Sequence, residues 1–243
     1  MADVNKPSTE LPSKHSDLLL RLISAVVMVI IAGAALWLGG WFWIGLVALL
    51  AIGVLWEWNR LTSSMGLTIL GEALWMFIGV VYVGVAALGM AQIGETYAAW
   101  FVAIGFIAPI VAVDVGAYFA GRAIGGPKIA PSISPSKTWA GLAGGALAAT
   151  IVALAVQYFY PEGELFGPPS PDGLGAMGVL AIVVAGIVIA VLAQAGDFFE
   201  SWMKRKAGVK DSSNLIPGHG GLFDRLDGFL AVFFVISLTR NLL

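Results

Sequence analysis

The sequence contains no cysteine and little charge. Without cysteine the chain can form no disulfide bond, thiolate metal site or cysteine nucleophile. Only 12% of its residues are charged and 59% are hydrophobic, whereas an ordinary soluble domain is roughly a quarter charged. The composition, with a mean hydropathy of +0.90, argues against a water-soluble monomer.

Three common catalytic motifs are also missing. The chain has no G-x-x-x-x-G-K-[ST], H-E-x-x-H or G-x-S-x-G segment, so a P-loop NTPase, a zincin metalloprotease and a serine hydrolase are unsupported. The net charge of −2 says nothing about partners by itself, because in a membrane protein the position of each charge matters.

Apolar stretches long enough to cross a bilayer follow one another with little polar sequence between them. They predict an all-α bundle of about seven transmembrane helices, with an eighth left open, and a polar site at the cytoplasmic face. The expected spans are Leu18–Leu38, Trp41–Trp56, Ala73–Ala91, Tyr97–Phe119, Thr138–Tyr160, Leu174–Gln194 and Phe229–Leu242. The first two are nearly continuous around Gly39 and Gly40, and form either a tight hairpin or one kinked, partly re-entrant unit.

The chain divides into a short tail and one membrane domain. Residues 1–17 are polar and predict a disordered cytoplasmic tail, and residues 18–243 form a single transmembrane domain. The first apolar segment has no polar cleavage region, which favours an uncleaved span over a signal peptide. The spacing of Gly141 and Gly145 predicts close helix packing.

Basic residues gather in alternate loops, as the positive-inside rule requires. They precede the first span and follow the second, fourth and sixth: Lys6, Lys14, Arg21, Arg60, Arg122, Lys128, Lys137, Lys204, Arg205, Lys206, Lys210 and Arg225. The opposite loops hold Glu95, Glu162, Glu164 and Asp172, and only Arg240 falls on their side. We therefore expect the N-terminus and the polar loops to be cytoplasmic, in a bacterial cytoplasmic (inner) membrane.

Three acidic residues in the segment from residue 193 to residue 228 predict a metal site. Asp197 ends an apolar run, where an ionised carboxylate needs a metal ion or a basic partner. Asp224 and Asp227 are three residues apart and share one face of a helix. Mg²⁺ takes one or two carboxylates and leaves positions for phosphates. We expect Asp197 and Asp224 to hold Mg²⁺, and a second, monovalent cation is left open.

The same segment contains groups that suit phosphate. Glycines on both sides of His219 let the backbone turn sharply and bring N–H groups against an anion. These glycines are Gly218, Gly220 and Gly221. Arg225 can bind phosphate bidentately. Lys204 and Arg205 add positive charge. A basic run alone is better explained by topology or by attraction to anionic lipid, but within the full motif these two residues are candidates for substrate binding.

A second polar loop, from residue 114 to residue 141, is expected on the same side of the membrane. Ser134, Ser136, Lys137 and Thr138 supply phosphate-binding hydroxyl and ammonium groups at the mouth of the fifth span. Asp114 is either a further substrate-binding candidate or a helix-packing residue satisfied by a hydroxyl.

The two loops resemble the motifs of the phosphatidate cytidylyltransferase (CDP-diacylglycerol synthase) family. The matching elements are Lys204-Arg205, Lys210-Asp211, Pro217-x-His219-Gly220-Gly221, Asp224-Arg225-x-Asp227, Asp114-x-Gly116-Ala117-Tyr118 and Ser134-Pro135-x-Lys137-Thr138. The resemblance implies transfer of CMP from CTP to phosphatidate, with Mg²⁺ required and pyrophosphate and CDP-diacylglycerol as products. It also implies the catalytic residues Lys210, Asp211, His219, Arg225 and Asp227. Whether His219 contacts metal, cytidine or phosphate is left open.

Two other classes of function stay open. One is a different lipid enzyme that uses CTP or ATP, such as a lipid kinase or an ether-lipid CDP synthase. The other is a transporter with Asp197 as a coupling site, although transporters usually place their sites near the membrane midplane between repeats, and the chain shows no internal repeat. The expected partners are CTP, phosphatidate and the lipid bilayer, without nucleic acid, and a homodimer is left open.

Overall fold

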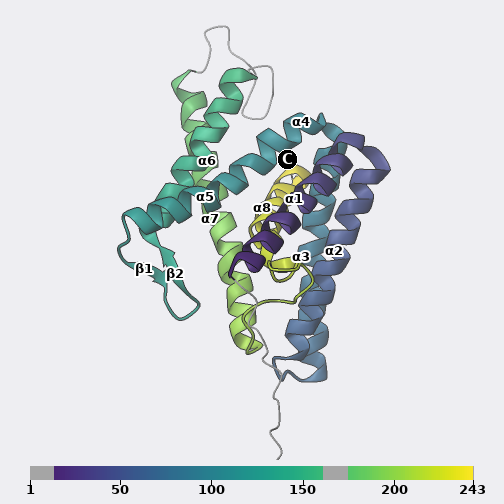
Figure 1. Ribbon diagram of the computed structural model, residues 1–243. Helices are drawn as coiled ribbons and strands as arrows, with labels where there is room; N and C mark the ends of the chain where they lie inside the picture. Colours follow the sequence, from purple (N-terminus) through teal and green to yellow (C-terminus); the bar gives the residue numbers. More distant parts are fainter. Residues whose placement is uncertain (1–13, 161–174, 243) are drawn as a thin grey trace, which may run out of the picture.

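The computed structural model describes residues 14–160 and 175–242, most of them helical (Figure 1). The helices are α1 (Lys14–Leu38), α2 (Gly40–Ser63), α3 (Ile69–Thr96), α4 (Ala99–Phe101), the π-helix η1 (Val102–Ile107), α5 (Ala108–Ala123), α6 (Trp139–Phe159), α7 (Ala176–Lys206) and α8 (Phe223–Leu242). The strands β1 (Lys128–Ala130) and β2 (Ser134–Thr138) pair antiparallel. The all-α class is confirmed, and the small β-hairpin is an addition that the sequence did not suggest.

Six helical segments are long and apolar enough to cross a membrane: Leu18–Leu38, Gly40–Ser63, Ile69–Thr96, Ala99–Ala123, Trp139–Phe159 and Ala176–Lys206. Helix α8 is the seventh long helix of the described residues, which contain no eighth. It carries Asp224, Arg225 and Asp227 at its start and packs against α3 and α7. Helix α8, the most polar of the long helices, is therefore packed against other helices of the bundle.

The first two spans form a tight hairpin, one of the two predicted alternatives. Helix α1 ends at Leu38 and α2 begins at Gly40, and the chain reverses direction between them (Figure 1). Gly39 and Gly40 have φ angles of +63° and +47°, which glycine adopts without a Cβ penalty.

Several predicted boundaries differ from the structure. Helix α1 begins at Lys14 rather than Leu18. Residues 1–13, the rest of the expected tail, lie outside the described residues, as do Glu162, Glu164 and Asp172. The fourth span is a continuous helical segment whose π turn η1 ends at Ile107, two residues before Pro109. Proline lacks an N–H and crowds the preceding turn, so irregular hydrogen bonding is expected there.

The helices form two groups joined by α7. Helices α2, α3 and α8 pack together, α5 and α6 pack against each other, and α7 contacts both groups. Helices α5 and α6 approach closely: a Cβ on Gly116 would lie 2.5 Å from the carbonyl oxygen of Gly144, and one on Gly145 would lie 2.9 Å from that of Val113. This confirms the close packing predicted for the glycines of α6.

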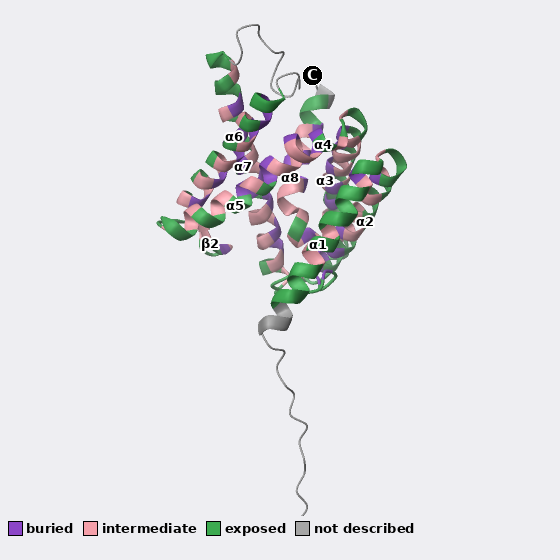
Figure 2. Ribbon diagram, turned by 45° about the horizontal axis from the view of Figure 1, so that its top comes forward, coloured by how far each residue is buried: buried purple, intermediate pink, exposed green. Residues whose placement is uncertain are grey.

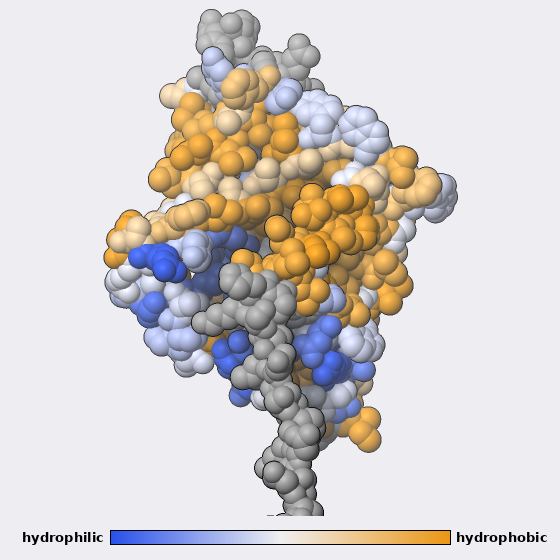
Figure 3. Space-filling model, viewed as in Figure 1, coloured by the Kyte–Doolittle hydropathy of each residue, from blue (hydrophilic) through white to orange (hydrophobic). Residues whose placement is uncertain are grey.

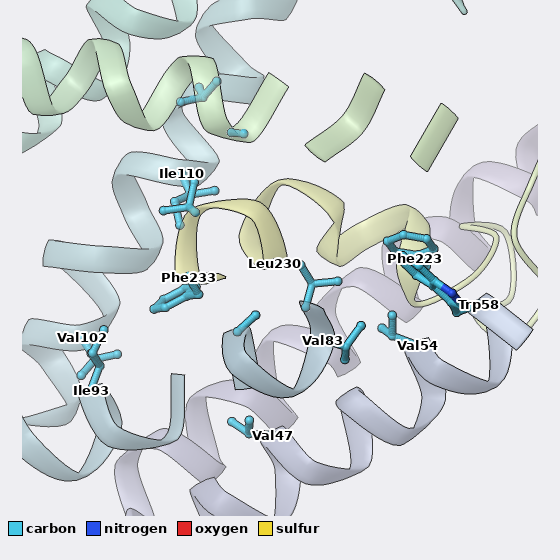
Figure 4. Packing of buried hydrophobic residues seen from close by; sticks show 14 of the residues in the cluster. Val47, Val54, Trp58, Val83, Ile93, Val102, Ile110, Phe223, Leu230 and Phe233 are labelled. Carbon is cyan, nitrogen blue, oxygen red and sulfur yellow. The ribbon is translucent and has the colours of Figure 1, made fainter. Parts of the chain in front are cut away.

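The buried core between α2, α3 and α8 includes Trp58, which lies beside Phe223 at one end of the cluster (Figure 4). The Trp58 ring lies 5.6 Å from that of Phe199 and 5.7 Å from that of Phe223, and its Nε1 donates to the carbonyl oxygen of Trp75 at 2.9 Å. Buried aromatic contacts of this kind fix helix positions, so Trp58 ties α2 to α7 and to the start of α8.

The outer surface separates into an apolar and a polar region. Much of the outer surface of the long helices is exposed (Figure 2). Many of these exposed side chains are large and apolar, which suits contact with lipid. Figure 3 shows a broad hydrophobic band, with hydrophilic side chains gathered below it around the β-hairpin and the C-terminal end of α7. The two polar loops therefore meet at one end of the bundle.

Candidate active site

A polar cavity of about 560 Å³ lies where α5, α6, α7 and α8 meet β2. Eight residues expected from the sequence line it: Asp114, Ser136, Lys137, Thr138, Asp197, Asp224, Arg225 and Asp227. Arg122 and Gln194 add further polar groups. Both polar loops thus contribute to one cavity, which contains four carboxylates and three basic side chains.

Asp197 on α7 has the basic partner that its position requires. Lys137 Nζ lies 2.6 Å from Asp197 Oδ2, and Ser201 Oγ donates to Oδ1 at 3.3 Å. Because Lys137 belongs to β2, this ion pair joins the β-hairpin to the long helix. Lys137 is thus the basic partner that the sequence predicted as one of two alternatives.

Asp224 is held by four hydrogen bonds. Lys204 Nζ donates to Oδ1 at 2.6 Å, and Oδ2 accepts from Ser212 N at 2.9 Å, Ser212 Oγ at 2.7 Å and Gly221 N at 2.8 Å. Lys204 also pairs with Glu200 at 2.6 Å. Glu200 is 1% exposed, and its Oε1 has no hydrogen-bond partner in the described part of the chain. This buried cluster connects the end of α7 to the start of α8.

Asp227, one turn further along α8, has different surroundings. Within the described residues its side chain accepts one hydrogen bond, from Gly228 N to Oδ1 at 2.8 Å, and forms no ion pair. Like Asp114 and Asp197, it lines the cavity. Asp227 therefore has acceptor capacity that no protein donor uses.

The glycine-rich loop turns sharply, as predicted. Ile216 N donates to the carbonyl oxygen of Gly220 at 2.8 Å, and His219 N to that of Ile216 at 2.9 Å. Gly218 and Gly220 have φ angles of +74° and +86°, a region that favours glycine. The N–H of Gly221 points at Asp224, so this donor serves a carboxylate of the protein.

His219 holds Arg225 through its backbone. The His219 carbonyl oxygen accepts from Arg225 Nε at 3.1 Å and Nη2 at 2.8 Å. Its ring Nδ1 lies 2.8 Å from Ser24 Oγ on α1. Arg225 lines the cavity and His219 does not, so His219 affects the cavity through the guanidinium group.

Thr138 has a structural task in addition to its place in the cavity. It is the N-cap of α6, and its Oγ1 accepts from Gly141 N at 3.0 Å, which satisfies a donor that the helix start leaves free. The segment of serines, lysine and threonine that was predicted to bind phosphate therefore also caps the start of α6.

The remaining expected residues lie around the cavity rather than in its wall. Arg205 is exposed, and its Nε donates to the carbonyl oxygen of Ile133 at 3.4 Å. Lys210 and Asp211 are exposed in the turn after α7. The expected residues that do not line the cavity are Ser134, Lys204, Arg205, Lys210, Asp211, Gly218, His219, Gly220 and Gly221.

Comparison with known proteins agrees with the motifs of the two loops. Residues 63–243 match the model of the cytidylyltransferase family. The chain belongs to this family. The phosphatidate cytidylyltransferase of Rickettsia bellii (strain RML369-C) is 34% identical over 94% of this chain and 93% of its own. Those of Rickettsia typhi (strain ATCC VR-144 / Wilmington) and Brucella suis biovar 1 (strain 1330) are 31% and 34% identical, over 96% and 89% of this chain and 97% and 70% of their own.

Family membership confirms the resemblance and makes the chain a cytidylyltransferase. Both polar loops lie within the matched residues, whereas α1 and nearly all of α2 precede them. The transporter interpretation gains no support from the comparisons.

Two buried acids of this cytidylyltransferase, Glu57 and Glu200, were not predicted from the sequence. Glu57 on α2 is 0% exposed, and its side chain accepts hydrogen bonds from the segment 212–223. A signal was available, because Glu57 directly follows the second apolar run, the same situation that made Asp197 a candidate.

The carboxylates of the cavity fit a hard divalent cation such as Mg²⁺. This ion prefers oxygen ligands and usually binds through one or two carboxylates, with phosphates and water in its other positions. The described residues contain no group of three His, Cys, Asp or Glu side chains that could hold a metal ion. An ion bound mainly by substrate and water needs no such group.

Proposed function

We propose that this chain transfers CMP from CTP to phosphatidate in the polar cavity, forming CDP-diacylglycerol and pyrophosphate. The observation that carries the proposal is the convergence of the two motif-bearing loops on one cavity, where carboxylates and basic side chains face the same space. The substrates are those of the phosphatidate cytidylyltransferases to which the chain is similar.

Phosphatidate brings its own nucleophile. The second pKa of a phosphate monoester is about 6, so no strong general base is needed at pH 7. A phosphatidate oxygen attacks the α-phosphorus of CTP, the bond from that phosphorus to the bridging oxygen breaks, and pyrophosphate leaves with the electron pair. Catalysis then rests on positioning and on neutralising negative charge.

Lys137 and Arg225 are the proposed phosphate-binding residues. Arg225 is fixed by the carbonyl oxygen of His219, so its remaining N–H groups form a planar donor surface for phosphate oxygens. The ammonium group of Lys137 lies in the same cavity, where a phosphate oxygen can take the place of Asp197 as its partner.

Asp197 and Asp227 are the proposed Mg²⁺ ligands. Bound Mg²⁺ supplies neutralisation of the triphosphate and of the charge that develops on pyrophosphate. Asp224, a metal ligand in the interpretation of the sequence alone, is assigned to holding the loop. Three protein donors already bind its Oδ2, and Lys204 binds its Oδ1.

We further propose that the cavity faces the cytoplasm from a bacterial inner membrane. The last turns of α2, α5 and α7 all carry basic residues, which favours the cytoplasmic side. A lipid whose tails stay in the bilayer must meet a soluble nucleotide at the interface, and the cavity lies at the polar end of the bundle.

Product analysis tests this function. Purified protein in detergent is given phosphatidate, Mg²⁺ and either CTP or ATP, and the released phosphates and the lipid product are identified. We expect pyrophosphate and CDP-diacylglycerol with CTP alone. Release of a nucleoside diphosphate would indicate a lipid kinase, and a preference for ether-linked phosphatidate would change the substrate class. No product from folded protein would overturn the proposal.

A further inference from the structure

Glu57 joins the two ends of the glycine-rich loop. Its Oε1 accepts from Ser213 Oγ at 2.5 Å and from Leu222 N at 2.9 Å. Its Oε2 accepts from Ser212 Oγ at 2.9 Å and from Phe223 N at 2.6 Å. Each carboxylate oxygen therefore connects the beginning of the segment 212–223 to its end. We call this arrangement of Glu57 and its four partners the Glu57 clasp.

The clasp is connected to the cavity through Ser212. The single proton of the Ser212 hydroxyl is shared between Glu57 Oε2, at 2.9 Å, and Asp224 Oδ2, at 2.7 Å, and the backbone N–H of Ser212 also donates to Asp224. Asp224 lies in the first turn of α8, which also brings Arg225 and Asp227 into the cavity wall. Displacement of Ser212 would therefore shift the first turn of α8 and with it the side chains that line the cavity.

The packing around Glu57 is specific to this arrangement. A Cβ on Gly53, one turn earlier on α2, would lie 2.4 Å from Leu222 Cδ1, and one on Gly221 would lie 2.4 Å from Glu57 Oε1. A buried carboxylate is costly unless hydrogen bonds satisfy it. Here it receives N–H groups of Leu222 and Phe223, which the start of α8 leaves without intrahelical acceptors.

We propose that Glu57 is a positioning residue for cytidylyl transfer, acting through the loop and the first turn of α8. This inference rests on the proposed function of the cavity. It adds a residue that lies before the segment matched by the family, residues 63–243, and that does not line the cavity. A purely structural role would lower stability without changing the turnover of the molecules that remain folded.

The test compares three variants of the full chain purified in detergent. Glu57→Ala removes all four hydrogen bonds of the clasp. Glu57→Gln keeps the size of the side chain but turns an NH₂ group toward two donors. Thr62→Ala is the matched control, because Thr62 is also buried on α2 and its hydroxyl, among the described residues, bonds to carbonyl oxygens of its own helix, those of Trp58 and Asn59.

We expect kcat per folded molecule to fall about 10- to 100-fold in Glu57→Ala, the range for loss of a group that orients functional residues. The loss should be smaller in Glu57→Gln. The KM for CTP should change less than kcat, since misplaced cavity groups stabilise the transition state less. Backbone amides of residues 212–223 should exchange with deuterium faster in Glu57→Ala, and Thr62→Ala should change neither measurement.

Wild-type kcat in folded Glu57→Ala would overturn the positioning role. If the unmodified protein forms no CDP-diacylglycerol, the proposed function fails and the positioning role fails with it. Deuterium exchange at residues 212–223 still tests whether Glu57 holds this segment in place. If Glu57→Ala does not fold, Ser213→Ala decides, because it removes a single donor to Oε1. Faster exchange with lower kcat supports the proposal, and unchanged kcat contradicts it.

Discussion

Asp224 and Asp227 lie one turn apart at the start of α8, yet their surroundings are opposite. Asp224 accepts four hydrogen bonds, one of them from Lys204. Asp227 accepts one, from the adjacent Gly228. The same contrast separates Glu57, whose oxygens accept from four donors, from Asp197, which has one lysine and one weak serine contact.

The contrast divides the acids at the polar end of the bundle into two kinds. Carboxylates whose oxygens accept several hydrogen bonds from the protein hold backbone segments in place, because removing such an acceptor leaves buried donors without a partner. Carboxylates that face the cavity with few protein donors are available to a cation or to a substrate. We call Glu57 and Asp224 the anchor carboxylates, and Asp114, Asp197 and Asp227 the cavity carboxylates.

Asp227→Asn should have the largest effect on turnover and little effect on stability. Asparagine keeps the shape but removes the charge that the cation needs, so turnover should fall by more than about 100-fold, beyond the range for an indirect contact. The melting temperature should not change, because only one local hydrogen bond is involved. Product formation and thermal unfolding are measured on the same preparation. Full activity would remove Asp227 from the metal site.

Asp224→Asn should lower turnover and stability together. An amide cannot accept at both positions, so donors around Oδ2 or Lys204 lose their partner. The Asp224 side chain is 9% exposed, and breaking a buried ion pair costs about 3–5 kcal/mol. We expect about 10- to 100-fold lower turnover and a lower melting temperature. Lost turnover at an unchanged melting temperature would instead make Asp224 a cavity carboxylate, as the sequence alone suggested.

The sequence predicts the helices and the meeting of the two loops for simple reasons. A bilayer sets the length of apolar runs, and the distribution of lysine and arginine assigns the loops to one side. The spacing of Asp224 and Asp227 also places both on one helix. The spacing cannot show which of the two carboxylates receives hydrogen bonds from the protein. The donors to Asp224 come from Ser212 and Gly221, in a loop whose path depends on Glu57, more than 150 positions earlier in the sequence.

The β-hairpin was unpredictable for a related reason. Strand β2 consists of Ser134–Thr138, which has no apolar alternation and a single β-branched residue, Thr138, so it lacks the pattern that indicates a strand. Its position depends on distant contacts, such as the ion pair between Lys137 and Asp197. Sequence reasoning therefore identified the chemical groups of the site and not the contacts that arrange them.

Lys137→Ala should have an intermediate effect. It removes a proposed phosphate-binding group and the partner of Asp197, and we expect kcat/KM to fall about 10-fold, which corresponds to about 1.4 kcal/mol. Lys128→Ala is the control, since Lys128 belongs to the same hairpin but is exposed, and its ammonium group donates at 3.4 Å to the carbonyl oxygen of Ser136 and to no carboxylate of the described residues. An unchanged kcat/KM in Lys137→Ala would show that Lys137 does not bind substrate and that its charge serves only membrane topology.

Thr138→Ala should have the smallest effect on turnover, because the main contact of the hydroxyl is with the start of α6. Loss of the N-cap should cost about 1 kcal/mol of stability, and Thr138→Ser, which can cap in the same way, should melt close to wild type. The hydroxyl accepts from Gly141 N, so its own proton stays available to a phosphate oxygen. If kcat/KM falls in Thr138→Ala as far as in Lys137→Ala, the hydroxyl proton of Thr138 donates to substrate, and Thr138 belongs to the substrate-binding groups of the cavity.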